Sequence, residues 1–224
     1  MQNPKTNESN LRNLSRFLYR VSHNYRRLIS YQAEMVDLTA LNVIPQIDFT
    51  EDAHDDEKIK TSYFNTLVQL DKMNMQSEIL KCLLIAWRED TFYGYTYEDD
   101  SGFFIYPLDG DYCKVSSVNY DGTLNCAFDF SYFRSHTADL EYWDSEFNSK
   151  YNSFQSDNTL RWQELDPERT FVIKVNIDDP TLNMPPLSGL FEPLIDLIDL
   201  QSIQSVKDDL SIYKPFGCKI RNTY

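Results

Sequence analysis

Apolar residues recur at three- and four-residue intervals near the start of the chain. The spacing is that of a helix and runs through nearly three heptads, at Leu11, Leu14, Leu18, Val21, Tyr25 and Leu28. Asn10 suits the N-cap position, because its side chain can accept a hydrogen bond from the first turn. The pattern therefore predicts one long helix from Asn10 to the region of Asp37–Asn42, before Pro45.

The other face of this predicted helix is basic. Arg12, Arg16 and Arg20 form an i, i+4 row. Such a row fits two interpretations: a face that meets an acidic partner, or an ordinary solvated face. We treat the three arginines as a candidate basic partner face.

The middle of the chain changes from helical to strand periodicity. A helix over Lys58–Met73 and a second over Ile79–Glu89 are predicted from their apolar faces. Runs rich in aromatic and β-branched residues follow, separated by Asp- and Gly-containing turns. They predict strands at Thr91–Glu98, Phe103–Tyr106, Tyr112–Asn119 and Thr123–Phe130. The expected product is a small antiparallel meander after a helix, in an α+β fold.

The last third predicts two helices and a strand. An aromatic stripe predicts an amphipathic helix through Leu140, Trp143, Phe147, Tyr151 and Phe154. A strand over Thr170–Asp178 and a proline-rich loop lead to a final helix of roughly 36 Å, at about 1.5 Å per residue. Apolar residues surround much of its first half, Leu194 and Ile198 among them, so we expect it to be buried on several sides. The same helix carries an acidic stripe at Glu192, Asp196 and Asp199, and Lys207 follows. The stripe could face a channel, or it could be an ordinary solvated face of the helix.

Charge narrows the choice of function. The 224 residues carry a net charge of −14, which argues against a surface that grips nucleic-acid phosphates. The sequence contains no N-terminal apolar segment that would predict a signal peptide and no long apolar run that would predict a membrane span. We therefore expect no membrane association. The 15 tyrosines and 14 phenylalanines suit surfaces that are buried only on assembly.

Candidate chemistry is sparse. The four cysteines form no CxxC pair; Cys113 and Cys126 could face each other across a hairpin, but reduced buried thiols are the favoured interpretation. The acidic run around His54 lacks calcium-loop spacing and is interpreted as a solvated loop before a helix. No nucleophile elbow or phosphate-binding Gly-rich loop is present. We therefore expect a protein that is not an enzyme, without catalytic residues, metal or cofactor.

One stretch resembles a known family. The residues "ILKCLLIAWREDTFYGYTYEDDSGFFIYPLDGDYCKVSS", continued by "DGTLNCAFDFSYF", resemble the wing region of portal proteins of tailed bacteriophages. The resemblance extends in order from Leu11 to Pro215, with the loop before Ser188-Gly189 similar to the passage from wing to stem. It implies a mobile arm (1–9), a wing-like α+β domain (10–187), a stem-like helix (188–214), and a tail or the start of a clip (215–224).

The resemblance also implies a function. Portal proteins form a closed ring, usually of twelve subunits, at one vertex of the capsid, where viral double-stranded DNA passes through without sequence-specific binding. The implied partners are further copies of the chain, the major capsid protein, the packaging motor (terminase) and head–tail connector proteins. The implied location is the virion, with assembly in the host cytoplasm. Glu192, Asp196, Asp199, Lys207, Leu194 and Ile198 would then belong to a channel or subunit-interface helix.

Two points qualify this expectation. The chain ends at "FGCKIRNTY", where a portal chain would continue into a clip, so a fragment, a truncated product or a reduced relative are all compatible with it. The alternative function is a non-enzymatic α+β virion or cytosolic module that binds protein partners through its aromatic surface. Such a module should bury Leu190–Leu200 within one subunit, whereas a portal subunit should need its neighbours to cover that helix.

Overall fold

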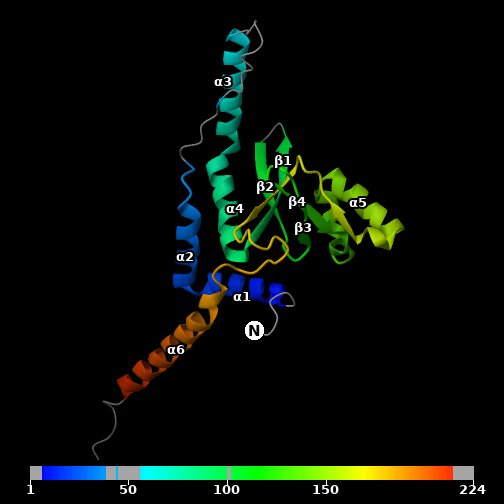
Figure 1. Ribbon diagram of the computed structural model, residues 1–224. Coiled ribbons are helices and arrows are strands. Elements are labelled where there is room, and N and C mark those ends of the chain that lie inside the picture. The colour runs from blue at the N-terminus through cyan, green and yellow to red at the C-terminus, as the bar shows by residue number, and fades with distance from the viewer. Residues whose placement is uncertain (1–6, 39–43, 45–55, 100–101, 214–224) are drawn as a thin grey trace, which may run out of the picture.

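The computed structural model describes residues 7–38, 44, 56–99 and 102–213 (Figure 1). Much of the expected arm and all of the expected tail lie outside these residues, as does most of the acidic run around His54, whose Asp56 and Glu57 begin a helix. Glu8 and Ser9, assigned to a mobile arm, instead open the first helix. A helical body surrounds two small sheets, and the predicted α+β class is confirmed.

The N-terminal region forms two helices, so the prediction of one long helix is wrong. Helix α1 spans Glu8–Val21 and α2 spans His23–Glu34, and α2 rises from the end of α1 in a different direction (Figure 1). Ser22 between them is extended (φ −99°, ψ 110°), and its side chain accepts a hydrogen bond from the backbone N–H of Tyr25 at 3.3 Å. Serine favours this N-cap role, so it starts a new helix in a new direction although the apolar spacing continues across it.

The next two helices are also separated at a single residue. Helix α3 (Asp56–Met73) and α4 (Met75–Glu89) meet at Asn74, which has the left-handed backbone angles φ 47° and ψ 45°. Asparagine tolerates this conformation better than most residues. Both helices were predicted. Helix α3 projects beyond the body (Figure 1), and its apolar Phe64 and Val68 are exposed.

The strands form two three-stranded antiparallel sheets. In the first, β1 (Thr91–Asp99) lies between β2 (Gly102–Leu108) and β6 (Thr170–Lys174). In the second, β4 (Leu124–Asp129) lies between β3 (Cys113–Val118) and β5 (Trp162–Glu164). The predicted hairpins are confirmed, but the continuous meander is wrong because β3 does not pair with β2.

Pro107 gives a physical reason for this division. A proline has no N–H to donate to a neighbouring strand, so it is tolerated mainly at the edge of a sheet. Pro107 lies in β2, opposite Gly94 of β1, and β2 is an edge strand. Strand β3 therefore does not extend this sheet beyond β2. The other side of β1 pairs with β6, which comes from far along the chain.

The aromatic stripe of the last third lies in the main core. Helix α5 (Ser145–Ser156) begins after Asp144, whose carboxylate accepts from the N–H of Glu146 at 2.9 Å. Its start is later than the predicted helix, because 137–142 forms a separate 3-10 helix and Trp143 is extended. Phe147, Tyr151 and Phe154 are buried in a cluster with residues of both sheets and of the 3-10 helix 130–134, and Leu140 and Trp143 pack against it.

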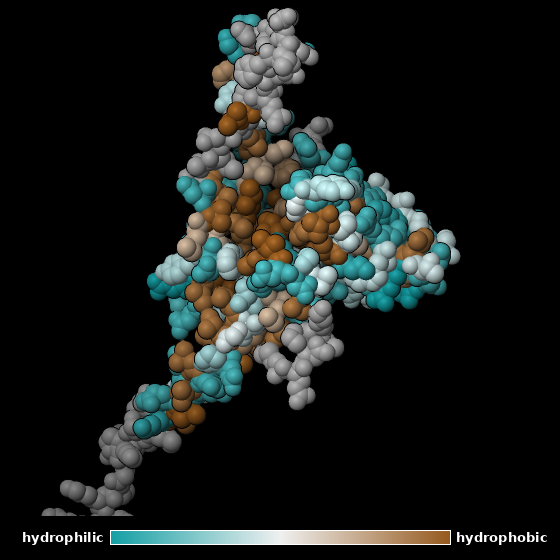
Figure 2. Space-filling view, viewed as in Figure 1, coloured by the Kyte–Doolittle hydropathy of each residue, from teal (hydrophilic) through white to brown (hydrophobic). Residues whose placement is uncertain are grey.

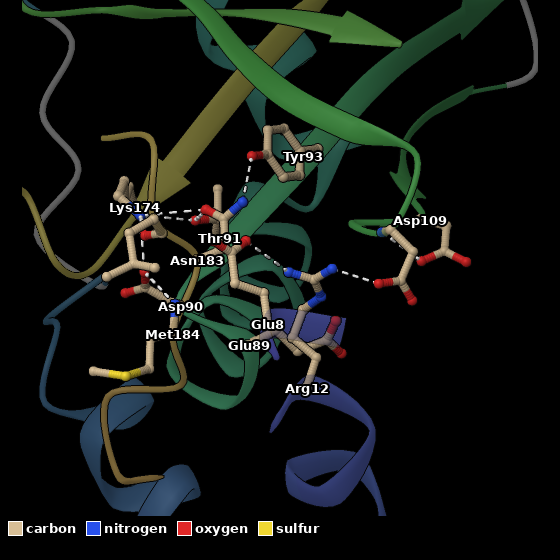
Figure 3. Close-up of polar contacts among 12 residues, drawn as sticks. Glu8, Arg12, Glu89, Asp90, Thr91, Tyr93, Asp109, Lys174, Asn183 and Met184 are labelled. Atoms are coloured by element: carbon tan, nitrogen blue, oxygen red, sulfur yellow. Dashed lines mark hydrogen bonds and ion pairs between the residues drawn. The ribbon is translucent and has the colours of Figure 1, made fainter. Parts of the chain in front are cut away.

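A buried ion pair joins the end of α4 to β6. Lys174 Nζ lies 2.8 Å from Asp90 Oδ2, and the two side chains are 2% and 0% exposed (Figure 3). Asp90 also accepts from the backbone N–H groups of Asn176 at 3.0 Å and Met184 at 3.3 Å. Lys174 donates in addition to the carbonyl of Leu182 at 2.8 Å. Because every charge has several partners, this network fixes the segment that leads to the last helix, α6 (Phe191–Tyr213).

Removing the cation of this pair should destabilise the fold strongly. We expect Lys174→Met to lower the free energy of unfolding by about 3–5 kcal/mol, because Asp90 would remain buried without its counter-charge. Urea unfolding followed by circular dichroism measures the change.

Two further variants test the cause. The double variant Asp90→Asn/Lys174→Met should recover part of the loss, since it leaves no buried charge. Lys60→Met, at an exposed position on α3, should change stability by less than about 0.5 kcal/mol. Equal effects of Lys174→Met and Lys60→Met would contradict the assignment.

Candidate functional site

The first two turns of α6 attach it to the body. Phe191 is 1% exposed and meets the ring of Tyr25 edge-on, with centroids 5.9 Å apart. Leu194 and Ile198 pack against the same cluster, which also contains Leu11, Leu18 and Ile29. The inward face of α6 is therefore the one that carries Leu194 and Ile198.

The acidic stripe lies on the opposite face of α6. Glu192, Asp196 and Asp199 are all exposed, and no ion pair joins them to any residue that the structure describes. Residues two positions apart differ by about 200° around a helix axis, so Asp196 points away from Leu194 and Ile198. The predicted channel or interface residues thus divide into an anchoring face and an outward acidic face. Lys207, further along, is exposed as well.

The rest of α6 extends away from the body. Leu200, Ile203 and Val206 are 63%, 63% and 57% exposed. Hydrophobic and hydrophilic residues alternate along this projecting helix (Figure 2). The composition of α6 predicts that it is buried on several sides, but a single copy of the described chain does not cover it in this way.

The arginine row meets acidic residues of the same chain. Arg12 pairs with Asp111, and Arg16 lies 2.6 Å from Glu89 and 3.4 Å from Asp109. The expected basic partner face is therefore wrong at Arg12, which is buried, and is reduced at Arg16, which is partly buried. The reason is that the β2–β3 turn and the end of α4 bring carboxylates against α1. Arg20 is exposed.

The pKa values in this contact reflect the pairing. Burial alone raises the pKa of Glu89, but the hydrogen bond from Arg16 and the charges of Arg88 and Arg16 outweigh it and lower the pKa below the ordinary 4.5. Asp111 behaves in the same way: burial raises its pKa, and the hydrogen bond and charge of Arg12 lower it overall. Both carboxylates are thus held in their charged form at neutral pH.

A cleft of about 380 Å³ opens beside this contact. Helices α1 and α4 contribute three arginines to it, Arg16, Arg20 and Arg88. Segments from β2 onward contribute the rings of Tyr106, Phe128, Tyr132 and Trp143. We call it the arginine cleft. Arg88 and the rings were not among the predicted site residues, because they come from separate segments that only tertiary packing brings together.

The described residues offer little for metal or thiol chemistry. No group of three His, Cys, Asp or Glu side chains among them could hold a metal ion. Cys82, Cys113 and Cys126 are free and buried, and the thiols of Cys113 and Cys126 contact each other across the β3–β4 hairpin. Burial raises the pKa of Cys82 to about 12, which suppresses its nucleophilic thiolate form. No described helix is long and apolar enough to span a membrane.

Comparisons with known proteins add no family. No family model, curated protein or solved structure matches this chain. Any functional proposal therefore rests on the geometry of α6 and of the arginine cleft.

The Glu89 contact should make stability depend on pH. A carboxylate whose pKa is lowered by folding stabilises the protein fully above its unfolded value near 4.5, and this contribution is lost as the pH falls through the lower folded value. We expect Glu89→Gln to cost about 2 kcal/mol at pH 7, less than a fully buried pair because Arg16 and Arg88 still reach water. The difference from wild type should shrink below pH 4.5.

Urea unfolding of both proteins at pH 7 and at the lowest pH where both stay folded measures this change. Glu141→Gln, which removes an exposed carboxylate, should alter stability at pH 7 by less than about 0.5 kcal/mol. A Glu89→Gln penalty that is the same at both pH values would refute a role for the ionised carboxylate.

Proposed function

We propose that this protein is a portal-type subunit, which assembles head-to-tail into a closed ring at a capsid vertex of a tailed phage. In this function the ring is the passage for DNA during packaging and ejection, and the packaging motor and connector proteins dock on it. The observation that carries the proposal is α6: a helix of 23 residues, attached by Phe191, Leu194 and Ile198, that projects with apolar residues uncovered. The ordered resemblance of the chain to portal wing and stem supports it.

The exposure of α6 distinguishes the proposal from its alternative. A self-contained interaction module should bury Leu190–Leu200 in its own core. Here Leu190, Ile195, Leu197 and Leu200 are 40%, 38%, 38% and 63% exposed. Apolar surface of this extent on a projecting helix is typical of a contact with other subunits. The observation therefore favours an assembling subunit over a monomeric module.

The charge of the chain suits a passage for DNA. A net charge of −14 gives no general affinity for phosphates, and the acidic stripe on the outward face of α6 adds local repulsion. A wall that repels DNA weakly lets the duplex move without being held. In this proposal the ring performs no catalysis and requires no cofactor, and the motor supplies the work.

The mass of the full chain in solution tests the proposal. Light scattering over a concentration series should find a large closed oligomer of fixed size. Leu200→Glu should raise the concentration of half-assembly at least about tenfold, because a carboxylate placed in an apolar contact costs about 1.4 kcal/mol or more.

Gln201→Glu is the matched control, since it adds the same charge at the next exposed position of α6. Circular dichroism should show that both variants keep the wild-type helix content, because neither position is in the core. A chain that is monomeric at every concentration would contradict the proposal, as would equal effects of the two variants.

A further inference from the structure

The arginine cleft gathers three guanidinium groups, from Arg16, Arg20 and Arg88, in a strongly acidic protein. The carboxylates of Glu89 and Asp109 line it as well, and Asp111, the partner of Arg12, lies 3.5 Å from Arg16. Glu89 is shared between Arg16 at 2.6 Å and Arg88 at 2.9 Å. Arg20 is exposed and forms no ion pair with any of the described residues. Among the three arginines of the cleft, Arg20 is therefore the one to which the described residues give no anionic partner.

The arginines of the cleft are held in place before any partner arrives. Arg88 is fixed by Glu89 and lies over the ring of Tyr19, with its guanidinium carbon 5.5 Å from the ring centre. Arg16 is fixed by Glu89, Asp109 and Asp111. Each guanidinium has five N–H donors, so these contacts leave donors for a further carboxylate. Preorganised cations of this kind lose little freedom on binding.

The acidic stripe of α6 has the complementary charge but cannot reach the cleft of its own chain. Glu192, Asp196 and Asp199 lie opposite the face that packs on α1 and α2 through Leu194 and Ile198. Turning the stripe toward α1 would remove Phe191 from its buried position. A stripe that points outward can meet a cleft only on another molecule.

We propose that the arginine cleft of one copy receives the acidic stripe of α6 from a neighbouring copy, with Arg20 as the pairing residue at its rim. The inference rests on the assembly proposed above and names the contact that orders it. Because stripe and cleft are different surfaces of the same chain, their contact can repeat head-to-tail, which closes a ring or extends a filament, or it can occur twice in a reciprocal dimer. The aromatic residues Tyr106 and Trp143 of the cleft give the charge contact a partly apolar surrounding.

A charge swap on the full chain tests the contact. One variant is Arg20→Glu, and the other is the triple change Glu192→Lys, Asp196→Lys and Asp199→Lys. All four positions are exposed, so the fold should be unaffected. Each variant alone brings like charges together, and half-assembly measured by light scattering should require at least about tenfold more protein than wild type.

Mixing the two variants is the decisive step. In an equimolar mixture the unchanged stripe of one variant faces the unchanged Arg20 of the other, and the lysine stripe faces the carboxylate of the Arg20→Glu variant in the same way. Assembly should return to within about threefold of wild type. Added salt should weaken wild-type assembly, because the contact is electrostatic. Lys60→Glu, a charge reversal on α3, is the control that should change nothing.

The outcomes separate this inference from the proposed function. A closed ring whose assembly ignores both variants would overturn the contact and leave the portal proposal in place. Charge-dependent assembly into dimers or open filaments would support the contact and contradict the proposed closed ring. A single-stranded oligonucleotide is the last probe. If it binds wild type, does not bind the Arg20→Glu variant and leaves assembly unchanged, the occupant of the cleft is a nucleic-acid phosphate and the contact is refuted. A wild-type chain that never associates would overturn both.

Discussion

The junction between α4 and β1 is the point on which the rest of the structure depends. Two consecutive buried carboxylates end the helix there: Glu89 binds Arg16 of α1, and Asp90 binds Lys174 of β6. Two adjacent residues thus connect α4 to α1 on one side and to β6 on the other. Asp90 has a positive φ of 75°, an unusual conformation that turns the chain sharply from helix to strand.

The same junction determines where α6 begins. Asp90 accepts the N–H groups of Asn176 and Met184, so it holds both ends of the segment before the helix. Ser15 adds a second connection. Its hydroxyl donates to the carbonyl of Arg88 at 2.6 Å and lies 2.8 Å from the hydroxyl of Tyr25. Tyr25 in turn packs on Phe191. The direction of the projecting helix is therefore set by buried polar contacts around α4, while its attachment is apolar.

Local patterns in the sequence were sufficient for most of the elements. Helices α3, α4 and α6 and strands β1 to β4 follow from periodicity and turn residues, because those signals act over a few residues. The break at Ser22 was missed because the apolar spacing runs on across it, and only the capping hydroxyl marks it. The pairing of β1 with β6 joins strands about eighty residues apart, a choice that tertiary packing makes.

The site was predicted less completely than the fold, for a related reason. The acidic stripe of α6 was found because its spacing is local, and its exposure agrees with a wet face. The arginine row was found too, but a helical wheel cannot show that Asp109 and Asp111 of a distant turn will neutralise it. Trp143 and Tyr106, which line the arginine cleft, gave no signal of their own beyond that of core aromatics.

The charge distribution limits how copies of this chain can associate. Each copy carries −14, and Arg12 and Arg16 are already paired inside it, so the surface left to a neighbour is mostly acidic. A symmetric two-fold contact satisfies both signs only if the stripe of each copy reaches the cleft of the other at the same time. Cleft and stripe instead lie on different surfaces, on α1–α4 and on the outward face of α6. A head-to-tail arrangement pairs them in every subunit, and it is the arrangement that a closed ring of more than two subunits requires.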